Sequence, residues 1–251
     1  MRRHVFVLWF ALLGLSAGAQ TPTVESIMDK YIEASGGREA MQAVKSMRLS
    51  GKLTIKNQGI TGAMEISFKA PNKVFVKQDI TGIGSVQQGF DGKTGWAQDP
   101  FSGLRDLEGA ELEALKREAS LESALNWKQH FKKWEYLGEE SVKDKKAHKV
   151  SFEPKVGKPV VKFFDVESGQ LIRQDGWSES PMGEVPVSTY LSDYRKEGNI
   201  TMPFKMTASM AQVEIEIQFS KLETNIGIED KIFVRPGGAP KDTEDKPLSL
   251  K

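Results

Sequence analysis

The sequence predicts an α+β protein in which a long antiparallel β-sheet is accompanied by a few amphipathic helices. Two observations predict this class. Several segments between residues 47 and 219 alternate apolar and polar residues with a period of two, which is typical of strands with one dry and one wet face. The alternation is interrupted once, by a segment rich in Glu, Lys and Ala whose apolar residues have helical spacing. We find no internal repeat, so we expect one domain over residues 20–236.

Residues 1–19 are expected to be a cleaved signal peptide. Arg2 and Arg3 precede an unbroken apolar run over residues 5–15, and residues 17–19 are the small residues of a cleavage site. The alternative is an uncleaved membrane anchor, but the run is short of the roughly 20 residues that a spanning helix needs. The sequence has no cysteine for a lipid anchor or a disulfide. We therefore expect a periplasmic chain that starts at Gln20 and is not stably inserted in a membrane.

Charge is nearly balanced, with 35 Lys and Arg against 34 Asp and Glu in the full sequence. Loss of the two signal-peptide arginines shifts the balance to one net negative charge. A polyanion partner such as nucleic acid would require a basic surplus, so none is expected.

A helix is expected at the start of the mature chain. Val24, Ile27, Met28, Tyr31 and Ile32 recur at helical spacing, and two glycines at 36 and 37 end the pattern. A short second helix is expected over residues 38–45.

The strands follow as a meander. We expect strands at residues 47–55 and 64–68 around a turn at 57–59, then at 73–80, and on both sides of the Asp-Gly-Lys-Thr-Gly turn at 91–95. The interrupting helix is placed between Leu107 and Phe131, with Leu112, Leu115, Ala119 and Leu125 on one face. Strands resume near Tyr136 and at residues 149–153, 160–165, 171–176, 187–194 and 213–219. Residues 237–251 have no apolar period and are expected to be a disordered tail.

Catalytic or metal-binding chemistry is not indicated. Past the signal peptide the only histidines are His130 and His148, which we expect to be ordinary surface residues. Neither a nucleophile elbow nor a phosphate-binding glycine loop is present. The carboxylates are spread as on solvated faces. We therefore expect no enzyme activity, no cofactor and no metal.

The dry face of the sheet is the candidate binding surface. If the helices cover it completely, its residues form an ordinary core, whereas a sheet curled into an incomplete barrel leaves a lipid cavity under a helical lid. Methionines at 41, 47, 64, 206 and 210 would adapt to a flexible ligand. The cavity candidates are Met47, Leu49, Leu53, Ile55, Met64, Ile66, Phe68, Trp96, Val213, Ile215, Ile217 and Phe219. The lid candidates are Ile27, Met28, Tyr31, Leu112 and Leu115.

An ordered set of motifs resembles the periplasmic outer-membrane lipoprotein carriers, the LolA-like family. A strand from Gly62 leads into Lys-Ala-Pro-Asn at 69–72, and after a further strand come Asp-Gly-Lys-Thr-Gly-Trp at 91–96 and Asp-Pro-Phe at 99–101. Phe-Val-Arg-Pro at 233–236 is similar to the family's terminal motif. These motifs cover about a sixth of the chain. The resemblance implies a half-open antiparallel barrel with a helical lid and an apolar cavity for lipid.

One position departs from the family. Its carriers have an arginine directly before Pro-Asn, where it ties the lid closed, and this sequence has Ala70. Lys69 is adjacent but is expected on the opposite face of the strand. The lid latch is therefore missing or replaced.

The functional hypothesis is a non-enzymatic periplasmic carrier, of the lipoprotein-sorting type, that binds the acyl chains of a lipoprotein or another lipid. Its partners would be that lipid and inner- and outer-membrane envelope proteins. The alternative is an envelope sensor or interaction module on the same fold with a packed interior. For Trp96, lining a cavity mouth and plugging a barrel end are both open.

Overall fold

A single open antiparallel sheet forms the body of the protein. The computed structural model describes residues 21–180 and 183–238. Within them, 13 strands follow the order β6-β5-β4-β3-β2-β1-β13-β12-β11-β10-β9-β8-β7, so β6 and β7 are the edges and do not pair with each other. The expected signal peptide and all but the first two residues of the expected tail lie outside the described residues.

Nearly every connection joins neighbouring strands, as the sequence meander predicts. The exception is the connection from β6 to β7, which carries α3 and α4 and links the two edges of the sheet. In the middle of the sheet, the first strand β1 pairs with the last strand β13. The strands are β1 (Ser46–Ile55), β2 (Ile60–Lys69), β3 (Lys73–Ile80), β4 (Gly84–Phe90), β5 (Gly95–Asp99), β6 (Gly103–Asp106), β7 (Phe131–Val142), β8 (Lys145–Pro154), β9 (Val160–Asp165), β10 (Leu171–Ser180), β11 (Gly183–Glu197), β12 (Ile200–Met210) and β13 (Val213–Thr224).

The helices are few and short. They are α1 (Val24–Ala34), α2 (Arg38–Ala43), α3 (Gly109–Ala119) and α4 (Trp127–His130), with 3-10 turns η1 (Lys56–Gln58) and η2 (Asp230–Ile232). Thr23 caps α1, since its hydroxyl accepts a hydrogen bond from the Ser26 N–H at 3.1 Å. Gly36, just past the helix, has a φ of 116°, and a Cβ there would lie 2.2 Å from the Asn199 carbonyl oxygen. Only glycine fits this exit.

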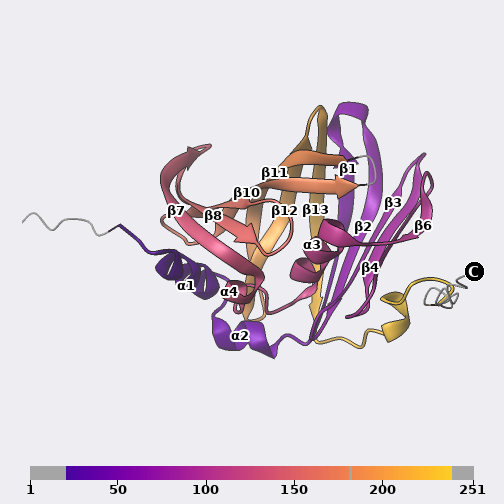
Figure 1. Cartoon of the computed structure of the whole chain (residues 1–251), viewed down its shortest axis with the longest axis horizontal. Helices are drawn as coiled ribbons and strands as arrows, with labels where there is room; N and C mark the ends of the chain where they lie inside the picture. The colour runs from indigo at the N-terminus through magenta and orange to yellow at the C-terminus, as the bar shows by residue number, and fades with distance from the viewer. Residues whose placement is uncertain (1–20, 181–182, 239–251) are drawn as a thin grey trace, which may run out of the picture.

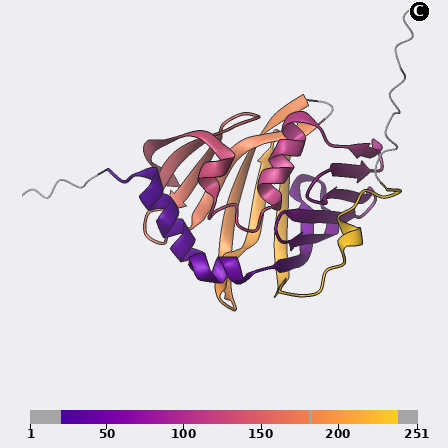
Figure 2. The same cartoon turned by 60° about the horizontal axis from the view of Figure 1, so that its bottom comes forward.

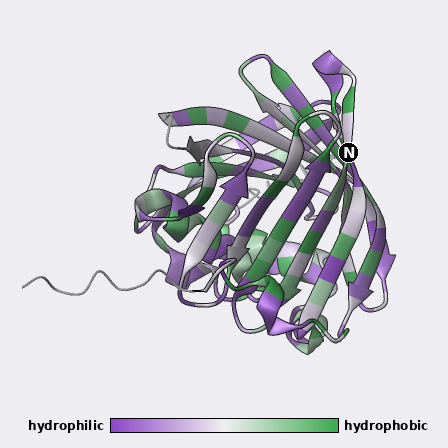
Figure 3. Cartoon of the chain, turned by 90° about the vertical axis from the view of Figure 1, so that its right-hand side faces the viewer, coloured by the Kyte–Doolittle hydropathy of each residue, from purple (hydrophilic) through white to green (hydrophobic). Residues whose placement is uncertain are grey.

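The sheet is curved, and the helices lie on its hollow side (Figures 1 and 2). Val24, Ile27 and Met28 of α1 and Trp127 of α4 pack on β8, β9 and β10. At the other end, Leu115 of α3 packs on β3 and β4. Between these two helical covers, the concave face carries an apolar cluster of residues from β1, β2, β12 and β13. Hydrophobic and hydrophilic bands alternate along the strands, as a sheet with two different faces requires (Figure 3).

Trp96 lies on the convex face. Its neighbour in β5, Ala97, lines a hollow on the concave face, so the Trp96 side chain points the opposite way. The indole packs against Phe75 and donates a 2.9 Å hydrogen bond from Nε1 to the Phe233 carbonyl oxygen. The segment after β13 crosses the outside of the sheet here (Figure 2). Trp96 therefore anchors that segment, and its assignment to the cavity is wrong in this structure.

Three elements differ from expectation. The helix expected up to Phe131 stops at Ala119, because Ser120 takes an extended conformation, and Leu125 lies beyond it in a turn. Strands β6 and β12 were not predicted. The first has only four residues, and Pro203 obscures the alternation of the second.

Candidate binding site

Three adjoining hollows lie on the concave face between the helices and the sheet. Their volumes are about 450, 290 and 170 Å³. All three are lined by Glu118, which projects from the last turn of α3. The two larger ones share no other lining residue, whereas the smallest shares residues with both. Glu118 therefore stands at the junction of one partitioned site.

The hollow of about 290 Å³ is apolar, and we call it the acyl hollow. It lies between α1, α2, the segment after α3 and strands of the middle of the sheet. Its apolar lining is Met41, Val44, Met47, Phe68, Leu121, Ala124, Leu191, Ile200, Met202 and Pro203. The phenol groups of Tyr31 and Tyr194 complete the wall, and burial raises the pKa of both. Flexible methionines and aliphatic side chains of this kind suit a ligand of variable shape.

The hollow of about 170 Å³ has aromatic walls and a charged group in each of several elements, and we call it the charged hollow. Trp127 packs edge-on against Phe152, with ring centroids 5.8 Å apart. Lys162 of β9 enters from the sheet, and its ammonium lies 5.7 Å from the Phe152 ring centroid. His130 of α4 also lines this hollow.

Partial desolvation disfavours charge on these groups, of which Lys162 and His130 are half-buried and Glu118 is exposed. It lowers the pKa of Lys162 to about 8, partly offset by Glu118, and it raises the pKa of Glu118. It also lowers the pKa of His130, with a further contribution from the positive charges of Arg117, Lys155 and Lys162. His130 Nε2 is buried without a hydrogen-bond partner.

The expectation that the histidines are surface residues is therefore wrong. His130 lines a hollow, and the His148 side chain is 14% exposed and lies 3.3 Å from the Tyr136 hydroxyl. His130 was misjudged because the packing of α4 turns it toward α3 and β9, and His148 because β7 pairs beside it.

The hollow of about 450 Å³ is the most polar of the three. Its polar lining includes Gln88, Gln98, Arg105, Glu111, Gln174, Ser178 and Thr189. Gln174 also lines the charged hollow, so the polar groups are continuous from one to the other. The site thus grades from apolar to polar across Glu118.

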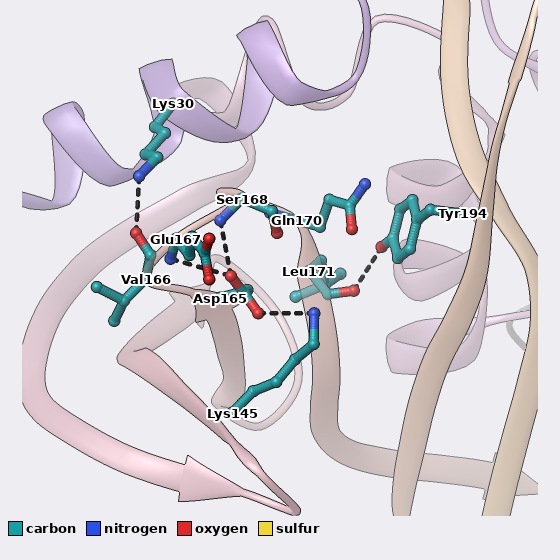
Figure 4. A network of polar contacts seen from close by, with 9 residues as sticks. All are labelled: Lys30, Lys145, Asp165, Val166, Glu167, Ser168, Gln170, Leu171 and Tyr194. Carbon is teal, nitrogen blue, oxygen red and sulfur yellow. Dashed lines mark hydrogen bonds and ion pairs between the residues drawn. The ribbon is translucent and has the colours of Figure 1, made fainter.

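Helix α1 is tied to the sheet at the turn that follows β9 (Figure 4). Lys30 donates a 2.7 Å hydrogen bond to the Val166 carbonyl oxygen. The turn is itself held by Asp165, which accepts hydrogen bonds from the backbone N–H groups of Glu167 and Ser168 and pairs with Lys145 at 3.0 Å. Burial alone would raise the pKa of Asp165, but these bonds outweigh it and lower that pKa. The contact fixes one end of the helical cover.

Helix α3 is tied at its first turn. The two terminal nitrogens of Arg105 in β6 donate 2.7 Å hydrogen bonds to the two carboxylate oxygens of Glu111. Both side chains are about three-quarters buried, at 26% and 21% exposure. This bidentate pair joins α3 to the sheet through charge.

Eleven of the twelve expected cavity residues lie on the concave face. The strand register places them on the same side of the sheet, where they form one apolar cluster. Met47 and Phe68 line the acyl hollow. The other nine, from Leu49 to Phe219, pack on one another beside it. Of the expected lid residues, Met28, Tyr31 and Leu115 line hollows, Ile27 packs on the sheet, and Leu112 contacts Gly95 of β5.

The polar members of the site were missed. One signal was available: Lys162 is the only polar residue in Val-Val-Lys-Phe-Phe at 160–164, a run whose pattern predicts a strand buried on both faces. A lysine in such a run faces a cavity or a partner.

Among the described residues, no three His, Asp or Glu side chains lie close enough together to hold a metal ion. The same part of the chain contains no helix long and apolar enough to cross a membrane.

No family model and no curated protein matches the chain. Solved structures do. A DUF1329 family protein from Desulfovibrio piger is 14% identical with a TM-score of 0.58, over 85% of this chain and 98% of that one. A LolA superfamily protein from Nitrosomonas europaea is 12% identical with a TM-score of 0.56, over 86% and 99%. A domain described as an outer membrane lipoprotein-sorting protein from Vibrio parahaemolyticus is 14% identical with a TM-score of 0.54, over 82% and 97%.

The open, curved sheet with helices on its hollow side defines an incomplete antiparallel barrel. The particular form of that class is the LolA-like fold, since the matches span nearly the full length of the structures concerned.

Proposed function

We propose that this protein is a non-enzymatic carrier in the periplasm that holds acyl chains of a lipoprotein or another lipid on its concave face. The acyl hollow carries the proposal. Its wall is continuous with the apolar cluster of β1, β2, β12 and β13, so a chain that enters it remains on apolar surface.

The driving force is the removal of apolar surface from water. Each methylene that leaves water contributes about 0.8 kcal/mol, so ten methylenes yield roughly 8 kcal/mol before the cost of association. A hollow of about 290 Å³ lies at the lower end of the usual range for small-molecule sites. Longer chains would therefore extend into the adjoining hollows or displace a helix.

The sensor alternative differs in its interior. A module that binds an envelope protein with its outer strands needs no internal space, and a packed interior would favour it. The hollows support the carrier proposal instead. Release of cargo would need the helical cover to move. Residues 1–19 would be removed on export, and the mass of the mature chain tests this.

The experiment is a titration of the delipidated, refolded protein with a fluorescent fatty-acyl probe. Ala124 lines the acyl hollow and the charged hollow, so Ala124→Trp is expected to weaken probe binding at least tenfold by occupying the space. Leu121→Trp is a second blocking variant, and Ser141→Trp on the exposed surface of β7 is the matched control. Failure of the parent protein to bind the probe, or equal binding by all four folded proteins, would overturn the proposal.

A further inference from the structure

The charged hollow contains an excess of basic groups, and it adjoins both the acyl hollow and the polar hollow of about 450 Å³. Lys162 and Arg117 line it, and Lys155 lies close enough to affect His130, whereas Glu118 is its one carboxylate. Among the described residues, Lys162 and Glu118 interact with each other and with Arg117 through charge, without a side-chain hydrogen bond between them. Neither charge is matched by a hydrogen-bonded partner of opposite sign in the described part of the chain, so both also act on a ligand in the hollow.

A lysine in this position is costly without an anion. The residues that face it are Glu118 and Arg117 from α3, His130 from α4, Tyr31 from α1 and Gln174 from β10. Its ammonium lies over the face of Phe152, and this cation–π contact is weaker than a hydrogen bond to an anion. A half-buried ammonium that keeps its charge is stabilised by an anionic oxygen at hydrogen-bonding distance.

The adjoining hollow supplies the rest of a ligand site. The charged hollow and the acyl hollow adjoin, because both are lined by Tyr31, Glu118, Ser123 and Ala124. We propose that the protein prefers a single-chain acidic amphiphile, whose anionic head group binds Lys162 while its chain occupies the acyl hollow. This inference rests on the proposed carrier function and names its ligand class.

The charge balance gives Glu118 a definite role. Its carboxylate stands at the junction of the hollows and repels an anion bound at Lys162. Removing the negative charge should strengthen binding of an acid, and removing the positive charge of Lys162 should weaken it. Neither change should alter binding of a neutral ligand with the same chain.

The test compares palmitate, hexadecyl phosphate and hexadecanol by isothermal titration calorimetry on the delipidated protein at pH 7. At least tenfold tighter binding of one of the two anions than of hexadecanol is expected, from the strength of a charged hydrogen bond. Lys162→Met should remove this preference, Lys162→Arg should retain it, and Glu118→Gln should increase it. Lys133→Gln, on the exposed surface of β7, is the matched control.

The possible outcomes separate the two proposals. Equal binding of all three ligands by the parent protein would overturn the head-group site and leave the carrier function intact. A preference for anions that persists in Lys162→Met would also overturn it. Absence of binding by all three ligands would contradict the carrier function itself.

Discussion

The contact between Arg105 and Glu111 is expected to control how often α3 leaves the sheet. In Glu111→Gln the amide oxygen can still accept one of the two 2.7 Å hydrogen bonds, but the charge is lost. Exposed ion pairs contribute about 0.2–1 kcal/mol and hydrogen bonds to charged groups about 1.5–3 kcal/mol. Since both side chains are about three-quarters buried, we expect a loss of roughly 1–2 kcal/mol from α3 docking, between those limits. The population with α3 undocked should then rise about 5- to 30-fold.

The assay is native-state hydrogen exchange of the amides of Gly109–Ala119. The matched control is Glu113→Gln on the same helix, which removes only an exposed pair with Lys116. Faster exchange over α3 in Glu111→Gln, with little change in Glu113→Gln and no change over α1, is the expected pattern. Equal exchange rates in the two variants would refute the assignment of this pair as the charged tie of α3.

Three further results are expected. Affinity for palmitate should fall as the pH rises through about 8, because the neutral form of Lys162 gains population there, and the loss should be absent in the alcohol titration. Trp96→Phe should lower the free energy of unfolding by about 1–3 kcal/mol in urea, since the buried carbonyl of the C-terminal segment loses its donor. Gly169→Ala should loosen α1 in hydrogen exchange, because the new Cβ would lie 2.7 Å from Lys30 Cγ, whereas Gly59→Ala, with a similar positive φ and open space, should leave α1 unchanged.

The sheet was predictable where alternation and turn residues agreed. The expected bounds of β1 and β3 agree with the structure to within one residue. β13 begins where it was expected but extends five residues further, to Thr224. β12 has apolar residues at every second position from Ile200 to Met210, yet Pro203 argues against a strand. In the structure Pro203 pairs with Tyr194 of β11. The preceding residue of β11, Asp193, has a φ of 52° and interrupts the regular pairing beside the proline. Only the paired partner shows why proline is tolerated there.

The apolar half of the site was predictable and the polar half was not. Alternation along β1 and β2 determines which residues share a face, and Met47 and Phe68 line the hollow on that face. Glu118 depends on how α3 is rotated on the sheet, and His130 on where the chain turns after Ala119. Those are tertiary choices made by packing, which a helical pattern in Glu-, Lys- and Ala-rich sequence leaves open. Trp96 failed for a related reason, because either face of β5 can accept an indole.

The most direct test of the carrier function is native mass spectrometry of the mature protein taken gently from the periplasm of its own host. A lipid carrier is expected to show an adduct with the mass of one acyl-chain amphiphile. If Lys162 selects the head group, that amphiphile is an acid. The adduct should be lost in Ala124→Trp. A bare polypeptide mass that persists after incubation with an excess of palmitate and of host lipid extract would contradict the carrier function.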